Sequence, residues 1–87
     1  MRDQEESKDL LYAIRALEIM MSSGVGLEAA ILSISGGGYG IISADFEKMI
    51  KQQKKGKTLE VSLRELMKKA SSKGYNKLLT TMYNNVK

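Results

Sequence analysis

A nine-residue pattern occurs twice in this 87-residue chain and constrains its fold more than any other feature. Residues 23–31 read SGVGLEAAI and residues 55–63 read KGKTLEVSL, so both match Gly-x-x-Leu-Glu-x-x-(Leu/Ile) at an interval of 32 positions. The glycine can take the left-handed conformation that ends a helix, and the two aliphatic residues share one face of the helix that follows. A glutamate in that helix's first turn interacts favourably with the helix dipole. The pattern therefore predicts two helix–turn–helix joints, made by Gly24, Leu27, Glu28 and Ile31 and by Gly56, Leu59, Glu60 and Leu63.

Apolar residues at helical spacing predict five helices around these joints. The first ends near residue 23 and carries this stripe: Leu10, Ala13, Ile14, Leu17, Met20 and Met21. The others are expected over residues 27–35, 43–55, 58–70 and 75–87, with Ser43 and Thr58 as N-caps. Four glycines within residues 36–40 cannot hold a helix and predict a connector. The expected fold is all-α, an antiparallel bundle of about five helices built from helix-hairpin pseudo-repeats.

Length and composition indicate one small domain. A chain of 87 residues is one domain, and without cysteine it has no disulfide to reinforce a small core. We expect residues 1–87 to form a single helical domain, with the polar residues 1–8 as a flexible N-terminal tail. A small bundle with six methionines is also expected to form a weak homodimer that completes its core.

The residue types argue against an enzyme. The chain has neither histidine nor cysteine, which removes the usual general base, the thiol nucleophile and the common zinc ligands. We therefore expect no catalytic residue, no cofactor and no metal site.

The glycines also do not form a nucleotide site. Gly56, Lys57 and Thr58 resemble the end of a phosphate-binding loop, but Lys51 stands where its first glycine is required, and a lysine-rich helix precedes it instead of a strand. The glycine run at 36–40 lacks the Gly-x-Gly-x-x-Gly spacing, because position 41 is isoleucine.

Charge is divided unevenly along the chain. Residues 1–47 carry three basic and eight acidic side chains, a net charge of −5, whereas residues 48–87 carry eleven basic and two acidic, a net charge of +9. A basic half can face an anionic partner, the cytoplasmic side of a membrane or nucleic acid.

The paired joints, separated by an acidic helix start and a basic helix end, resemble the cytoplasmic domain of the type II secretion system protein F family. That family includes the platform proteins of type IV pili and of the archaeal flagellum. The resemblance covers about residues 10–87 through these segments: SSGVGLEAAI, YGIISADFEKMIKQQKKG, KTLEVSLRELMKKASSKG and YNKLLTTMYNNVK. The chain departs from the family pattern at Val61-Ser62, often Glu-Ala in the family, and in its long glycine run.

The resemblance implies a non-enzymatic scaffold at the cytoplasmic face of the inner membrane. Such a domain contacts the assembly ATPase and other platform components. The chain is then expected to be a soluble fragment of a larger protein, which reaches the membrane through segments outside it.

A contact surface and two alternative functions remain open. We expect Tyr39, as the most exposed tyrosine, and the cluster Lys51, Lys54, Lys55 and Lys57 to form the partner surface. The alternatives are a basic helical module that binds nucleic acid and a soluble adaptor bundle. Nucleic acid is the weaker partner, because the basic half has little arginine, the better reader of bases.

Overall fold

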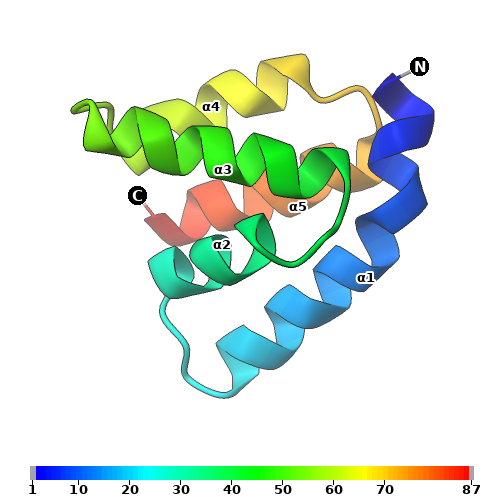
Figure 1. Ribbon diagram of the computed structural model, residues 1–87, viewed down its shortest axis with the longest axis horizontal. Helices are drawn as coiled ribbons and strands as arrows, with labels where there is room; N and C mark the ends of the chain where they lie inside the picture. The colour runs from blue at the N-terminus through cyan, green and yellow to red at the C-terminus, as the bar shows by residue number, and fades with distance from the viewer. Residues whose placement is uncertain (1, 87) are drawn as a thin grey trace.

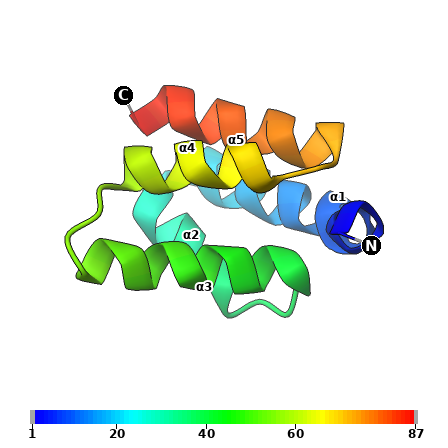
Figure 2. The same ribbon diagram turned by 90° about the horizontal axis from the view of Figure 1, so that it is seen from above.

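The computed structural model describes residues 2–86, and the side chains of residues 4–86. Over that range it holds five helices and no strand: α1 (Arg2–Ser22), α2 (Leu27–Ser35), α3 (Ile41–Lys54), α4 (Leu59–Lys69) and α5 (Lys73–Val86). Each helix packs against the next, and α1 also packs against α3 and α5. The chain reverses direction between α3, α4 and α5, which lie side by side in Figures 1 and 2. The predicted all-α bundle is confirmed.

Every helix contributes its apolar side to one shared core. The bulkiest fully buried side chains are Tyr75 and Phe46, which come from α5 and α3. The other members of the core are Ala13, Leu17, Ala30, Ile31, Ile34, Ile42, Met49, Leu59, Leu63, Leu66, Leu79 and Met82. Within residues 2–86, no helix is both long enough and apolar enough to span a bilayer.

The start of α3 differs from the expectation. The helix begins at Ile41, and Ser43 lies inside it instead of capping it. Gly40 precedes the helix with a φ of 58°, a conformation that favours glycine, so the chain can enter the helix earlier than predicted. The Ser43 hydroxyl instead accepts a hydrogen bond from the Tyr39 N–H at 2.8 Å and donates one to the Ile34 carbonyl at 2.6 Å. Ser43 thereby fastens the α2–α3 connector to the end of α2.

Asp45 is a buried carboxylate on α3. It is 6% exposed and accepts a hydrogen bond from the Tyr75 hydroxyl at 2.9 Å. Its spacing from Ile42 and Met49, which are both buried, is the sequence signal that puts it on the inner side of α3. This pair joins α3 to α5 across the core.

Residues 2–8 do not form the flexible tail that composition predicts, and residue 1 lies outside the described residues. Residues 2–8 make the first two turns of α1, and the Glu6 side chain is fully buried. Its carboxylate accepts hydrogen bonds from the backbone N–H groups of Ser71, at 3.1 Å, and of Ser72, at 2.7 Å. Ser72 in turn caps α5 by accepting the Tyr75 N–H at 3.1 Å. The carboxylate therefore lies at the N-terminus of α5, where the helix dipole favours an anion.

Candidate functional site

The two predicted joints have the same backbone hydrogen bonds. In the first, the Val25 N–H donates to the Met20 carbonyl at 2.9 Å and the Gly24 N–H to that of Met21 at 3.2 Å. The equivalent bonds in the second run from Lys57 to Gln52 and from Gly56 to Gln53, both at 3.0 Å. The φ angles of Gly24 and Gly56 are 86° and 100°. Both joints are therefore glycine-terminated Schellman motifs, the geometry in which a left-handed residue satisfies the last carbonyls of a helix.

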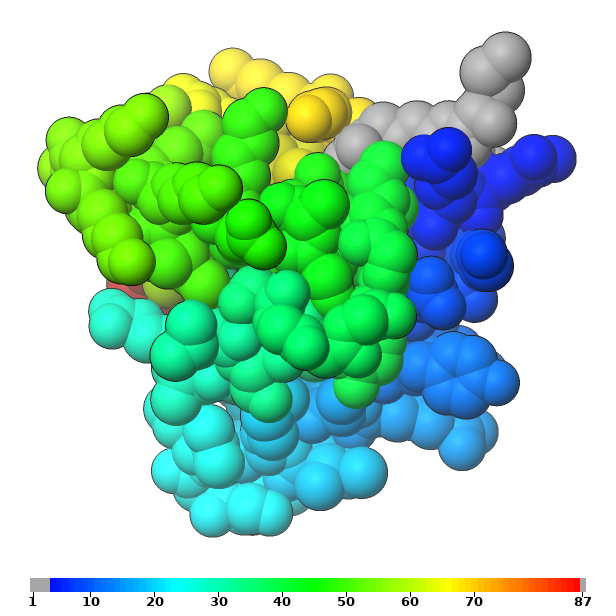
Figure 3. All heavy atoms as spheres, in the orientation of Figure 1, coloured from blue at the N-terminus to red at the C-terminus, as the bar shows by residue number. Residues whose placement is uncertain are grey.

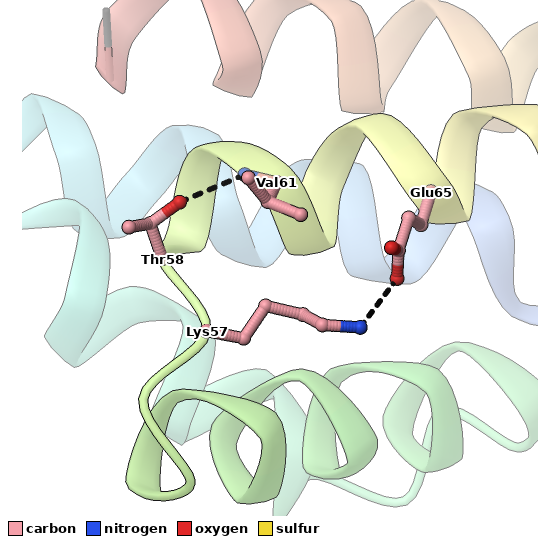
Figure 4. Close-up of polar contacts among 4 residues, drawn as sticks. All are labelled: Lys57, Thr58, Val61 and Glu65. Carbon is pink, nitrogen blue, oxygen red and sulfur yellow. Dashed lines mark hydrogen bonds and ion pairs between the residues drawn. The ribbon is translucent and has the colours of Figure 1, made fainter.

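The N-cap residue of the following helix has nearly the same backbone conformation in both joints. Gly26 has φ −66° and ψ 155°, and Thr58 has φ −72° and ψ 155°. The side chains differ: the Thr58 hydroxyl accepts the Val61 N–H at 3.2 Å, whereas Gly26 has no side chain to cap with (Figure 4). The predicted N-cap at Thr58 is confirmed.

The aliphatic residues of the joints are structural. Ile31, Leu63 and Leu59 are buried in the core, and Leu27 is half-buried against it. The two glutamates lie in the first turns of α2 and α4, where Glu28 is exposed and Glu60 is half-buried. Of the joint residues, Gly24, Glu28 and Gly56 are exposed to a partner.

The fold brings the two joints to the same end of the bundle. Residues 26–29 of the first joint and Leu59 of the second line one hollow of about 460 Å³, together with Asn85 and Val86 of α5. In Figure 1 the two joints lie at the upper left and the lower left of the molecule, with the end of α5 between them. The repeat therefore places two equivalent turns around the last turn of α5.

The predicted lysine cluster lies at the second joint. Lys51 and Lys54 are in the last turn of α3 and Lys55 is its C-cap, and all three are exposed. Cations at this end of a helix are favoured by its dipole. Lys57 differs, because it is half-buried and its Nζ lies 2.8 Å from Glu65 Oε1 on α4 (Figure 4). We call the exposed group Lys51, Lys54 and Lys55 the lysine end of α3.

Tyr39 does not join this cluster. It precedes α3, whereas the lysines follow it, and a 14-residue helix separates them by about 20 Å. It is also half-buried: its ring packs over Gly37, where any Cβ would clash with it. The most exposed of the tyrosines is instead Tyr12, at 66%. The structure thus separates the predicted partner surface into two places.

Acidic residues are interleaved with the basic ones. Lys51 Nζ lies 3.3 Å from Glu47 Oε1, one helical turn away, and Lys57 pairs with Glu65. Sequence reasoning missed Glu65, since Lys57 precedes α4 and no helical spacing links the two. A surface that neutralises phosphates needs uncompensated cations. The pairing of Lys51 and Lys57 with carboxylates reduces the charge that this cluster offers to phosphates.

Comparison with known proteins places the whole arrangement in one family. Residues 13–86 match the family described as type II secretion system (T2SS), protein F. No curated protein and no solved structure matches the chain. The matched range holds both joints and the lysine end of α3, and it begins after Glu6.

Proposed function

Since this chain belongs to the protein F family of the type II secretion system, we propose that it is the helical scaffold domain of an assembly platform at the cytoplasmic face of the inner membrane. The family consists of platform proteins of secretion and pilus-type assembly systems. The excess of basic residues in positions 48–87 supports the cytoplasmic side, because segments next to a membrane carry more Lys and Arg there.

A scaffold role fits the residues better than catalysis. With no histidine or cysteine, a reaction would depend on carboxylates or lysines. The two buried carboxylates, Glu6 and Asp45, are engaged with Ser71, Ser72 and Tyr75. They hold helices together, which is what a rigid platform requires.

We further propose that the lysine end of α3 contacts the assembly ATPase of the same system. The observation that carries this is the exposure of Lys51, Lys54 and Lys55 at the end of a helix held by the second joint. Three exposed cations at one helix end, of which Lys51 also pairs with Glu47, can meet an acidic patch and speed association with it. Such a surface gives specificity without a large apolar interface.

The test is binding of the assembly ATPase to a Lys51/Lys54/Lys55→Glu variant. Because like charges would then face each other, we expect the dissociation constant to rise by about tenfold or more. Surface plasmon resonance at two salt concentrations measures it, and the wild-type affinity should fall as salt increases.

A matched control changes the same charge elsewhere. Lys68, Lys73 and Lys77 are exposed on α4 and α5, so their joint replacement by Glu alters net charge equally. ATPase binding that is unchanged in the first variant, or weakened equally in both, would contradict the proposed contact. Salt-sensitive binding of duplex DNA without ATPase binding would support the nucleic-acid alternative instead.

A further inference from the structure

A small polar cleft lies between α3 and α4, which run side by side in Figure 2. Figure 3 shows this line from outside, where α4, in yellow, borders α3, in green, along the upper edge of the molecule. The cleft has a volume of about 170 Å³, roughly that of the 150 Å³ cavity in which another protein holds benzene. Two apolar and six polar residues line it: Met49, Leu66, Asp45, Lys48, Gln52, Ser62, Glu65 and Lys69. We call it the α3–α4 cleft.

The fold leaves the hydroxyl of Ser62 in this lining without a hydrogen bond. Ser62 is 1% exposed, and its Oγ has no partner among the described residues. A hydroxyl that is removed from water without a hydrogen bond destabilises a protein, whereas alanine would occupy nearly the same space without that cost. A buried and unpartnered polar group in the wall of a cleft indicates a ligand that bonds to it.

The two carboxylates of the cleft are engaged within the fold. Glu65 Oε1 accepts a hydrogen bond from Lys57 Nζ at 2.8 Å, and Figure 4 shows the lysine reaching it between the two helices. Asp45, which is buried, accepts the Tyr75 hydroxyl at 2.9 Å. In the part of the chain that the structure describes, no three acidic side chains come together as metal ligands. The cleft is therefore a poor site for a metal cation.

The polar side chains left over are all hydrogen-bond donors. Those of Lys48, Gln52 and Lys69 form no hydrogen bond or ion pair with another described residue. Together with the Ser62 hydroxyl they supply donors from both helices, and the two ammonium groups are exposed at the rim. With Lys57 included, three cations face two carboxylates, a net charge of +1. Unused donors around a positive cleft favour an anion.

We propose that the α3–α4 cleft binds an oxyanion, with Lys48 and Lys69 at its rim and the Ser62 hydroxyl at its floor. Charge-assisted hydrogen bonds from the two ammonium groups supply most of the affinity, and the Gln52 amide and the hydroxyl add neutral ones. A serine side chain has three staggered χ1 positions, so its hydroxyl can turn toward a ligand without a backbone shift. Phosphate and carboxylate groups both have this chemistry.

The oxyanion has two possible sources, a free phosphate ion or an acidic side chain of a protein partner. The second is open because the cleft adjoins the lysine end of α3: Lys48 and Gln52 also line a shallow hollow with Lys51 and Lys55. Only this second source rests on the proposed contact with the assembly ATPase. The oxyanion site itself does not depend on that contact.

The first test is a titration of the isotope-labelled 87-residue chain with sodium phosphate and with sodium acetate, followed by heteronuclear NMR. We expect saturable shifts of the backbone amides of the residues that line the cleft, with a dissociation constant on the order of 1 mM for phosphate. Sodium chloride at the same ionic strength is the reference, because it supplies an anion with the same screening but no oxygen acceptors.

Three single substitutions test the named donors. Lys48→Met and Lys69→Met should each raise the dissociation constant by about tenfold, and Ser62→Ala by about threefold to tenfold, as expected for a charged and a neutral hydrogen bond. Lys68→Met is the matched control: Lys68 is exposed beside Lys69 but does not line the cleft, so its affinity should equal that of the wild type. Urea denaturation should show Ser62→Ala to be at least as stable as the wild type, since no hydrogen bond within the described chain is lost.

ATPase binding distinguishes the two sources. If a carboxylate of the ATPase enters the cleft, the Lys48→Met/Lys69→Met double variant should weaken ATPase binding and phosphate should compete with it. If the ligand is a free phosphate, the NMR shifts persist and neither change affects the ATPase. Loss of the proposed ATPase contact would leave the NMR result standing, so the two failures can be told apart.

Four results would overturn the oxyanion site. The first is the absence of saturable shifts with both phosphate and acetate. The second is phosphate binding that survives Ser62→Ala, which would assign the ion to surface lysines only. An equal loss in Lys68→Met and Lys69→Met would show a general effect of charge. Lower stability of Ser62→Ala would mean that the hydroxyl serves the fold and not a ligand.

Discussion

The first and second joints have the same backbone but different side-chain support. Both end a helix with a left-handed glycine, both place the same two hydrogen bonds, and both start the next helix from nearly the same φ and ψ. Only the second adds a hydroxyl cap at Thr58 and an ion pair between Lys57 and Glu65. The shared elements are therefore sufficient to make the turn, and each joint adds side-chain contacts of its own. In the first, the Ser23 hydroxyl donates to the Ile19 carbonyl at 2.9 Å, and in the second the cap and the ion pair are added.

The largest expected effect comes from the buried aliphatic residue of each joint. Ile31 and Leu63 are 1% and 0% exposed at equivalent positions. We expect Ile31→Ala and Leu63→Ala each to lower the free energy of unfolding by about 2–5 kcal/mol, through lost burial and a new cavity. Urea denaturation followed by circular dichroism measures both. A loss at one position only would show that the two joints are not equivalent in the core.

The second largest effect on stability is expected at the left-handed glycines of the two joints. Gly24 and Gly56 have positive φ, and a Cβ at either would meet no atom within 4 Å, so the cost of alanine is purely conformational. We expect Gly24→Ala and Gly56→Ala each to cost about 1–2 kcal/mol. Chemical denaturation of both alanine variants tests whether the two changes lower the free energy of unfolding equally. Replacement by Asn, which tolerates this conformation better, should cost less and serves as the control.

Exchanging the N-cap residues of α2 and α4 tests how much the hydroxyl cap contributes to the difference between the joints. Gly26→Thr should add the missing hydroxyl cap to α2, and Thr58→Gly should remove it from α4. Since threonine caps only slightly better than glycine, each change should shift the free energy of unfolding by a few tenths of a kcal/mol, with opposite signs. Thermal melts of both variants and of the double exchange measure this. A Cβ at Gly26 would meet no atom within 4 Å, so destabilisation by Gly26→Thr would mean that the added hydroxyl does not cap α2.

The ion pair gives the smallest effect. Lys57 and Glu65 are 35% and 52% exposed, and exposed pairs contribute about 0.2–1 kcal/mol. A double-mutant cycle of Lys57→Met and Glu65→Gln should give a coupling within that range, and it should decrease in high salt. A coupling that does not change with salt would argue against an electrostatic origin.

Local sequence signals predicted the joints well. The features that the sequence did not predict depend on contacts between residues far apart in the chain. The bounds of α2, the glycine ends and the cap at Thr58 follow from residues within one turn of each other, so a single sequence contains them. The role of Ser43 depends on the Ile34 carbonyl, and the first turns of α1 depend on Ser71 and Ser72. The separation of Tyr39 from the lysines, by contrast, follows from the predicted helix over residues 43–55, because Tyr39 precedes that helix and the lysines lie at its end. Which lysines meet a partner stays a prediction.

Glu6 and Ser72 are 66 positions apart, so their hydrogen bond joins the first turns of α1 to the corner between α4 and α5. A contact of this separation closes a long loop and forms only after the entropy of closure is offset. The carboxylate has no site to enter until the α4–α5 corner exists, which places this contact late in folding. In a chain synthesised from its N-terminus, the first turns of α1 are therefore made 66 positions before the residue that fixes them.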